Sequence, residues 1–212
     1  TLLAKLLATL LLTQKGTPFI YQGEEIGMAN KKFSSMDDIE DVESKGVYEK
    51  LLKETGSEKK AFAAILAGSR DHGRSTMQWS SAAYGGFSIV KPWFETDDDY
   101  LICNVDDQLR DSDSVLNYYK KLIALRRENE DFIYSDIKIV NEHVYNYYSY
   151  IRGGFFIECN LCQRTIVKPK SVPKKMMNLV KVFGNYNDNE PTRLRPYEAT
   201  IYRIVKEHEH YE

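Results

Sequence analysis

The first 27 residues join a leucine-rich helical pattern to a short apolar run and a glycine-rich turn. Leucines cover most of the surface of a helix over residues 1–15, so we expect it to be buried on more than one side and to end at Gly16. Residues 17–22 are predicted to form a buried strand, with Pro18 at its start, where a missing N–H is tolerated. Such a helix, buried strand and glycine-rich exit make one step of a parallel α/β fold.

The stretch from residue 28 to residue 110 is polar and mostly lacks regular periodicity. Apolar residues at helical spacing predict a helix over residues 37–55 that Gly56 ends, and Ser57 is a suitable cap for a second short helix. Beyond residue 68 the periodicity stops, but aromatic residues are frequent. A long loop with side chains of the buried type is more often functional than a linker.

Helical patterning ends near residue 130, and β patterning follows it. Residues 111–129 give the clearest helix, with Val115, Tyr119 and Leu122 on one face. Short β runs separated by turn sequences come next and predict a small antiparallel domain. These runs are residues 136–140, 144–151, 155–161, 177–183 and 198–205.

Composition narrows the class of protein. The 212 residues are 42% hydrophobic and 28% charged, which is typical of a globular protein. The net charge of −2 argues against a nucleic-acid partner. The apolar start is interrupted by Lys5 and is shorter than the ~20 residues that span a bilayer, so we expect no membrane partner. Cys103, Cys159 and Cys162 form no disulfide framework, which indicates reduced thiols in a cytoplasmic protein.

One polar loop carries the side chains best suited to bind a ligand. Within residues 69–80, Arg70 and Arg74 flank an aspartate, and Gln78 and Trp79 follow them. Arginine offers planar donors to carboxylates or vicinal hydroxyls, and tryptophan offers a flat apolar face. This combination suits a sugar ring. A structural ion pair between the arginines and the aspartate beside them is the alternative that stays open.

Other chemistry-bearing residues have structural interpretations. Glu24 and Glu25 are neighbours that leave a predicted strand, and such neighbours point to opposite faces, which favours one exposed and one structural glutamate over a catalytic pair. We interpret His72 as a hydrogen-bonding loop residue, because no nucleophile or carboxylate can be assigned to it. Residues 97–99 lack the glycine and the distal glutamate of a calcium loop, and we predict no metal site.

Six motifs occur in a characteristic order along nearly the whole chain. They are residues 16–28, 41–44, 69–79, 86–93, 113–126 and 194–199. With these motifs the chain resembles the C-terminal part of an α-glucosidase of the α-amylase superfamily, glycoside hydrolase family 13. The branch it resembles holds oligo-1,6-glucosidase, dextran glucosidase and trehalose-6-phosphate hydrolase.

The resemblance implies a fold and a chain organisation. We expect an α+β fragment in which residues 1–130 form the last strand and helices of a (β/α)8 TIM barrel, with the exit loop of strand eight. Residues 131–212 are expected to form an antiparallel β-sandwich, domain C. Active sites of such barrels lie at the C-terminal ends of the strands, so residues 23–110 are expected to form one wall of the site. The missing N-terminal part of the barrel is then the expected partner of this chain.

The resemblance also implies a reaction, which is retaining hydrolysis of terminal α-1,6-glucosidic bonds in isomalto-oligosaccharides and dextran fragments, without a cofactor. A carboxylate nucleophile and a carboxylic general acid about 5 Å apart perform this chemistry. In the family they and a third, stabilising aspartate come from strands that precede residue 1, so we predict no catalytic residue here and no activity for this chain alone. Arg70 is implied to bind hydroxyls of the non-reducing glucose of the oligosaccharide substrate. Arg74 is implied to lie at the same cleft, and Glu43 to bind the leaving-side sugar.

The chain departs from the family pattern at three positions. Thr76 replaces a common proline, His72 the usual asparagine and Lys91 a common glycine, but both arginines are retained. Trehalose-6-phosphate hydrolase and α-1,4-glucosidase remain open as activities. The alternative outside the enzymes is a non-catalytic binding or accessory module with a related barrel, in which the arginine loop need not be kept.

Overall fold

The computed structural model of the chain describes all residues except 95, 142, 170–177 and 206–212. The chain divides into two compact units. Unit 1 consists of Thr1–Gly27 together with Asp111–Glu212, and unit 2 consists of Met28–Arg110. The boundary expected between residues 130 and 131 is a different division, and it stays a prediction.

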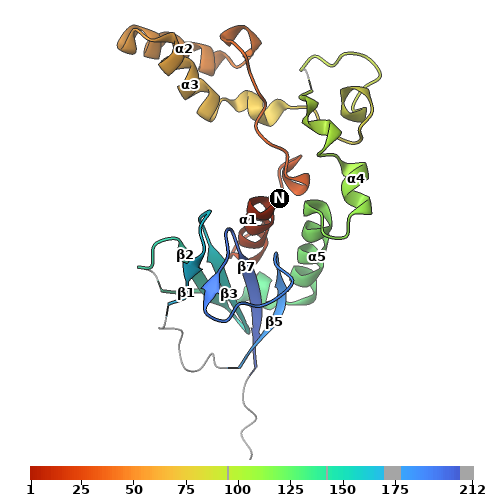
Figure 1. The fold of residues 1–212 in the computed structure, drawn as a ribbon, viewed down its shortest axis with the longest axis vertical. Coiled ribbons are helices and arrows are strands. Elements are labelled where there is room, and N and C mark those ends of the chain that lie inside the picture. The colour runs from red at the N-terminus through yellow and green to blue at the C-terminus, as the bar shows by residue number, and fades with distance from the viewer. Residues whose placement is uncertain (95, 142, 170–177, 206–212) are drawn as a thin grey trace, which may run out of the picture. The chain divides into compact units, whose positions relative to one another are not determined.

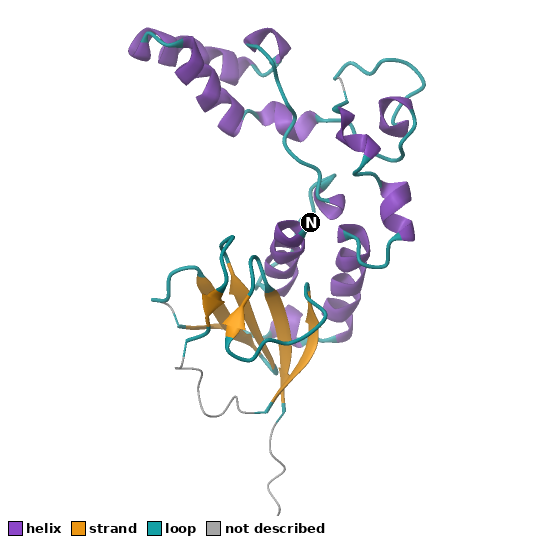
Figure 2. Ribbon diagram, in the orientation of Figure 1, coloured by secondary structure: helices purple, strands orange, loops and turns teal. Residues whose placement is uncertain are grey.

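Unit 1 is built on a five-stranded antiparallel sheet of order β1-β2-β3-β7-β5 (Figures 1 and 2). The predicted β runs form this sheet, and residue 177, the first of the predicted run 177–183, lies outside the described residues. Two short strands that were not predicted pair with each other in a second, two-stranded sheet. The strands are β1 Ile137–Val140, β2 Tyr147–Arg152, β3 Phe155–Asn160, β4 Ile166–Val167, β5 Leu179–Gly184, β6 Arg193–Leu194 and β7 Ala199–Ile204.

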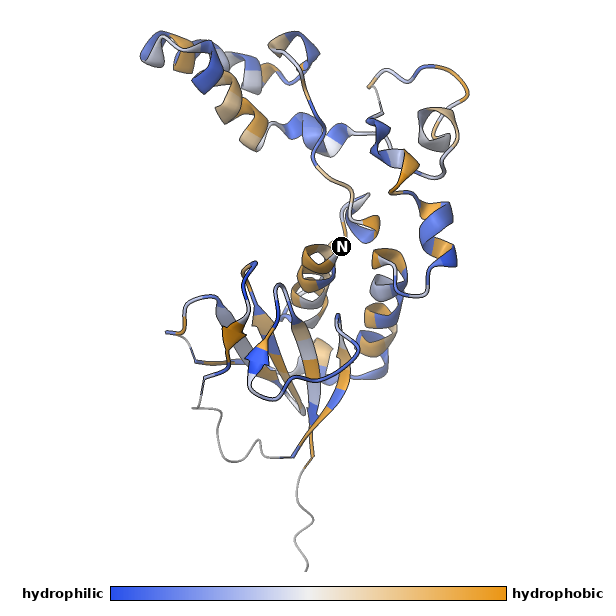
Figure 3. Ribbon diagram, in the orientation of Figure 1, coloured by the Kyte–Doolittle hydropathy of each residue, from blue (hydrophilic) through white to orange (hydrophobic). Residues whose placement is uncertain are grey.

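Two long helices of unit 1 share one apolar core with the sheet. These are α1 Leu2–Thr13 and α5 Val115–Glu128, and α1 is hydrophobic over most of its visible surface (Figure 3). Short helices are η1 Glu24–Ile26 and α6 Asp131–Tyr134. The core joins side chains of α1, α5 and α6 to side chains of β2, β3 and β7. Burial of α1 on more than one side was expected, but Leu3 and Leu7 are 43% and 47% exposed, so the side that carries them is not buried. Its buried members include Leu6, Leu12, Val115, Tyr119, Leu122, Phe132, Tyr150, Phe155, Ile157 and Ile201.

Two arginines bind the carbonyl groups at the end of α1. The last four carbonyls of a helix have no partner within the helix, and positive charge is favourable there. Arg126 donates to the carbonyl oxygens of Leu12 at 2.7 Å and Gly16 at 2.8 Å. Arg152, which is fully buried, donates to the carbonyl oxygen of Thr13 at 3.2 Å, and burial lowers the pKa of Arg152. The last two carbonyls of the helix, those of Leu12 and Thr13, therefore have partners inside unit 1.

The buried strand predicted over residues 17–22 is absent. These residues have no regular secondary structure and form no ladder with the described part of the chain. The side chains of Phe19 and Tyr21 are 83% and 61% exposed, so the predicted burial is also wrong. A strand depends on a neighbour for its backbone hydrogen bonds, and the structure offers this segment none. The helix before it ends at Thr13, with Gln14 rather than Gly16 as its cap.

Unit 2 contains a pair of helices that pack against each other, α2 Val42–Thr55 and α3 Glu58–Gly68 (Figure 1). Gly56 ends α2 in the left-handed conformation at φ +61°, and the Ser57 side chain accepts from the N–H of Lys60, as the sequence predicts. The start of α2 was predicted five residues too early. A separate turn with its own capping box precedes it there.

The rest of unit 2 consists of short turns and loops around a second core. Phe33, Ile39, Ile65 and Phe94 are its buried members. The short elements are η2 Met36–Asp38, η3 Arg70–Arg74, η4 Ala83–Gly86, η5 Asp98–Leu101 and α4 Val105–Arg110. No helix in the described part of the chain is long and apolar enough to cross a membrane.

Candidate functional site

A buried aspartate ties the arginine loop of unit 2 to the start of α2. Asp71 lies in η3, and its side chain is fully buried. Its Oδ2 accepts the backbone N–H groups of Glu40 at 2.7 Å and Asp41 at 2.9 Å. Its Oδ1 accepts from Nη1 of Arg74 at 2.8 Å. A single carboxylate therefore fixes both the backbone before α2 and one of the two arginines.

Asp41 is the N-cap of α2 and the second buried carboxylate of the site. Its Oδ2 accepts from the N–H of Ser44 at 3.0 Å and from the Ser44 hydroxyl at 2.7 Å. Its Oδ1 lies 2.9 Å from Nη2 of Arg70 and 3.7 Å from Nη2 of Arg74. The hydrogen bonds from Ser44, with that from Arg70, hold the pKa of Asp41 below its ordinary value. Asp41 is therefore ionised at neutral pH and attracts both guanidinium groups.

Glu43, in the first turn of α2, completes the cluster. Its Oε2 lies 2.9 Å from Nη2 of Arg70, and its side chain is 68% exposed. The hydrogen bond to Asp41 and the nearby carboxylates raise the pKa of Arg70. The structure thus brings together Arg70, Arg74 and Glu43, which the sequence had marked as substrate-binding residues.

Asp41 and Asp71 also belong to this cluster, although the sequence did not mark either as a site residue. A signal existed for Asp41, because an aspartate three residues before a serine at a helix start is a capping pattern. The sequence indicates Asp71 only as an ion-pair partner of the arginines, and the structure shows this pair with Arg74. Its two bonds to the backbone before α2 depend on tertiary structure.

Arg70 retains hydrogen-bond donors that point away from these carboxylates. A guanidinium has five N–H donors, and both observed contacts of Arg70 are made through Nη2. No residue in the described part of the chain contacts Nε or Nη1, and the side chain is 61% exposed. Arg70 lines a cavity of about 260 Å³ together with Asp41, Glu43, Ser69 and residues of α2 and α3. The ion pair therefore leaves Arg70 able to bind vicinal hydroxyls.

The other candidates of this region have structural partners. The Nε2 of His72 lies 2.9 Å from the carbonyl oxygen of Leu66, which confirms a hydrogen-bonding role in the loop. Gln78 is buried and donates to Asp99. Asp97 pairs with Lys31 at 3.2 Å. Within the described residues, no group of three or more histidine, cysteine, aspartate or glutamate side chains is arranged to hold a metal ion.

Comparisons with known proteins place this geometry in context. Residues 1–135 match the family model described as alpha amylase, catalytic domain. The oligo-1,6-glucosidase of Bacillus cereus is 34% identical over 212 residues, which cover 95% of this chain and 38% of the relative. The trehalose-6-phosphate hydrolase of Bacillus subtilis is 34% identical over 213 residues, which cover 96% of this chain and 38% of that protein.

Solved structures also align with nearly the whole chain. The trehalose-6-phosphate hydrolase of Bacillus licheniformis aligns with a TM-score of 0.88 at 30% identity, over 97% of this chain and 39% of that structure. The isomaltulose synthase of Klebsiella aligns with a TM-score of 0.88 at 29% identity, over 96% of this chain and 38% of that structure. The chain thus spans less than half the length of the relatives that it matches.

Proposed function

The chain belongs to the α-amylase family of glycoside hydrolases, family 13, and on that premise we propose that it forms one wall of the active-site cleft of a retaining α-glucosidase. The proposal concerns the whole enzyme, because the chain spans 38% of its Bacillus cereus relative. The observation that supports it is the state of Arg70, which two carboxylates hold in place while Nε and Nη1 have no contact within the described residues.

Arg70 positions a terminal glucose by donating to two of its hydroxyls. Asp41 and Glu43 hold its guanidinium through Nη2, so little side-chain freedom remains to be lost on binding. Arg74 adds a second positive charge beside Arg70 at the same cleft. Glu43 binds the sugar on the leaving-group side of the bond that is cleaved. The carboxylates that break the bond come from another part of the enzyme. This chain contributes orientation of the ring, which accelerates a reaction by holding the reacting groups in geometry.

We propose isomalto-oligosaccharides and dextran fragments as substrates, with cleavage at the terminal α-1,6 bond. Several relatives are named oligo-1,6-glucosidase, at 34% to 35% identity. Trehalose-6-phosphate hydrolase is the second candidate, because a relative at 34% identity and a structure with a TM-score of 0.88 bear that name. Cleavage of α-1,4 bonds is the third, since a relative is named alpha-glucosidase. A non-catalytic module is disfavoured, because the arginine cluster is complete and retains donors for a ligand.

The test uses Arg70→Ala in the enzyme that carries this chain. One charge-assisted hydrogen bond contributes about 1.5–3 kcal/mol, so kcat/KM for isomaltose should fall by about 10- to 150-fold. Arg110→Ala is the matched control, because Arg110 is also exposed and paired within unit 2 but does not line the Arg70 cavity. Equal kcat/KM values for both variants and the parent would make Arg70 a purely structural residue.

The 212-residue chain alone is a second test. It should not hydrolyse isomaltose or p-nitrophenyl α-glucoside, because the proposed nucleophile and general acid are supplied from outside it. Hydrolysis at a rate near that of a complete enzyme would contradict this assignment of the catalytic groups.

A further inference from the structure

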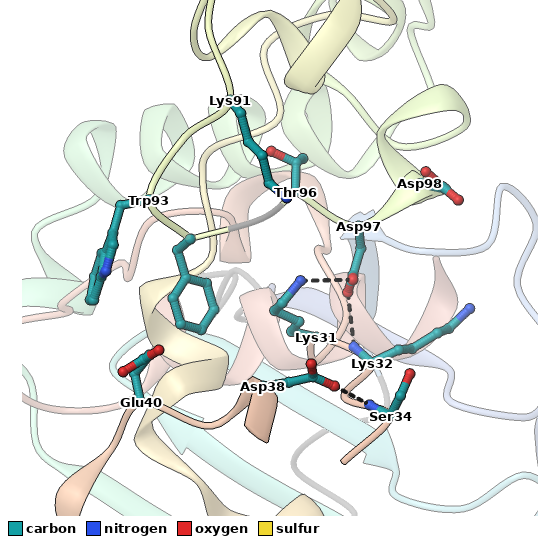
Figure 4. A pocket seen from close by; sticks show the side chains of 11 residues that line it. Lys31, Lys32, Ser34, Asp38, Glu40, Lys91, Trp93, Thr96, Asp97 and Asp98 are labelled. Carbon is teal, nitrogen blue, oxygen red and sulfur yellow. Dashed lines mark hydrogen bonds and ion pairs between the residues drawn. The ribbon is translucent and has the colours of Figure 1, made fainter. Parts of the chain in front are cut away.

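Unit 2 has a second hollow, here called the Trp93 pocket, whose lining side chains are drawn in Figure 4. Its volume is about 470 Å³, within the ~300–1,000 Å³ typical of small-molecule sites. It is lined by Lys31, Lys32, Ser34, Asp38, Glu40, Lys91, Trp93, Phe94, Thr96, Asp97 and Asp98. It shares no lining residue with the Arg70 cavity. Glu40 lines the Trp93 pocket, and the next residue, Asp41, lines the Arg70 cavity. The two hollows therefore border the same short segment but have different lining residues.

Trp93 gives this pocket an apolar wall that is fixed and yet exposed. The indole is 78% exposed, and its ring centroid lies 5.7 Å from that of Phe94. Phe94 is buried and packs edge-on against Phe33 at 6.1 Å, so the exposed ring rests on the core of unit 2. An exposed aromatic ring at the rim of a polar pocket is typical of a binding surface. No described residue bonds the indole N–H of Trp93.

The floor of the pocket is held by Lys31 and Asp97. The Lys31 ammonium lies 3.2 Å from Oδ1 of Asp97 and over the ring of Phe94 at 5.6 Å. Oδ2 of Asp97 accepts the backbone N–H of Lys32 at 2.9 Å (Figure 4). These contacts join the two segments that line the pocket, so its shape exists before any ligand binds.

Three further polar side chains of the pocket, those of Lys32, Glu40 and Asp98, can reach a ligand. No described residue contacts the carboxylate of Asp98 or the ammonium of Lys32. The Glu40 carboxylate is half-exposed, and its ion pair within the described residues is with Lys45 at 4.0 Å. Figure 4 shows Glu40 on the side of Trp93, and Asp98 and Lys32 at the opposite end of the pocket.

The charges of the pocket indicate a neutral ligand. Lys31 and Asp97 neutralise each other, and both signs remain among the other lining residues. A strongly anionic ligand would meet the carboxylates of Glu40 and Asp98, and a simple cation would meet Lys32. A molecule with many hydroxyls and an apolar face satisfies the whole set, because hydroxyls both donate and accept.

We propose that the Trp93 pocket binds a glucose unit of an α-linked oligosaccharide, as a second site outside the cleavage site. The choice of α-linked glucose rests on the proposed function, whereas the choice of a neutral sugar rests on the pocket. The indole of Trp93 stacks on the apolar face of the ring. Glu40 accepts from its hydroxyls, and Asp98 and Lys32, at the other end of the pocket, contact a neighbouring unit of the same oligosaccharide.

The chain contains two tryptophans, Trp79 and Trp93, which makes the pocket directly observable. Trp79→Phe leaves Trp93 as the single indole of the 212-residue chain. Titration of this variant with isomaltotriose and with maltotriose should change the Trp93 emission in a saturable manner, with a Kd on the order of 1 mM for at least one sugar. Inorganic phosphate should leave the emission unchanged, because the ligand is neutral.

Two further variants in the Trp79→Phe background locate the bound sugar. Glu40→Ala with Asp98→Ala should weaken binding about tenfold, since two hydrogen bonds are lost. Arg70→Ala should leave the titration unchanged, because Arg70 lines the other cavity. The altered side chains are exposed, and far-UV circular dichroism of each variant confirms that it folds as the parent does.

The outcomes separate this inference from the proposed function. No saturable change with either sugar, or the same change with phosphate, would overturn the Trp93 site. An emission change that Arg70→Ala abolishes and the double alanine variant leaves intact would assign the binding to the Arg70 cavity instead. If the titration behaves as expected while Arg70→Ala leaves kcat/KM of the whole enzyme unchanged, the Trp93 site stands and the role of Arg70 fails.

Discussion

Removal of the Asp71 side chain tests how the arginine loop is held. Its Oδ2 accepts hydrogen bonds from the backbone N–H groups of Glu40 and Asp41, and its Oδ1 accepts one from Arg74. Asp71→Ala removes all three bonds. Asp71→Asn can keep its oxygen on the two amides, but it then presents an NH₂ group to Arg74. The two variants therefore separate the hold on the backbone from the hold on the arginine.

The expected magnitudes follow from burial. Asp71 is fully buried, and a hydrogen bond to a charged partner contributes about 1.5–3 kcal/mol. In Asp71→Ala, the amides of Glu40 and Asp41 should lose this much protection, which corresponds to hydrogen exchange about 10- to 150-fold faster. The Arg74 side chain is 41% exposed, so water replaces much of its lost contact. Asp71→Asn should therefore lower the free energy of unfolding of unit 2 by only about 1 kcal/mol.

Amide hydrogen exchange of the 212-residue chain, followed by NMR, measures these effects at single residues. Asp38→Ala is the matched control, because Oδ2 of Asp38 also accepts two amides, those of Ser34 at 2.8 Å and Ser35 at 3.0 Å, but on the surface. Exchange of those amides should rise only about fivefold. If the Glu40 and Asp41 amides exchange at the parent rate in Asp71→Ala, the tie between the loop and α2 is refuted.

Three further predictions concern stability. A Cβ at Gly153, where φ is +52°, would lie 1.9 Å from Oδ1 of Asp131, so Gly153→Ala should lower the free energy of unfolding by at least about 2 kcal/mol in urea titrations. Gly56 also has a positive φ, +61°, but open space around it, so Gly56→Ala should lower the free energy of unfolding by about 1 kcal/mol. Equal losses in Gly153→Ala and Gly56→Ala would contradict the clash with Asp131. Arg152→Met should cost about 3 kcal/mol in the same titration, because buried carbonyls lose their donors, and an unchanged midpoint would mean that other groups satisfy them. The lowered pKa of Asp41 contributes stability that is present above pH 3.8 and is lost as the pH falls from 3.8 towards the folded-state pKa. Thermal melts of Asp41→Asn should not show this loss. If the melting temperatures of the variant and the parent fall in parallel as the pH is lowered, this contribution of Asp41 is excluded.

Local signals in the sequence predicted much of the fold. Gly56 and Ser57 fix the end of one helix and the start of the next through their own backbone and side chain, so their roles can be seen without tertiary information. The short β runs separated by turn sequences likewise predicted β2, β3 and β7. The pairing of β4 with β6 was missed, because two-residue strands are too short to show a period.

The failures of prediction share a dependence on distant partners. Residues 17–22 have the composition of a buried strand, but a strand forms only where another strand lies beside it. The candidate site was predicted in its arginines and in Glu43, which motifs reveal. The capping role of Asp41 has a local signal. The contacts of Asp71 with the Asp41 amide and of Asp41 with Arg70 join residues about 30 apart in sequence, and no local pattern encodes them.

The exposed segment at residues 17–22 limits the solubility of the protein. It carries no charged side chain, and no described residue bonds the backbone groups of Phe19 and Ile20. A second copy can extend such a segment into an intermolecular sheet, and Pro18 blocks only its own position. Encounters between copies rise with the square of concentration, so precipitation from dense solutions is expected well before the units themselves unfold. A lysine in place of Ile20 is the smallest change that raises this solubility limit.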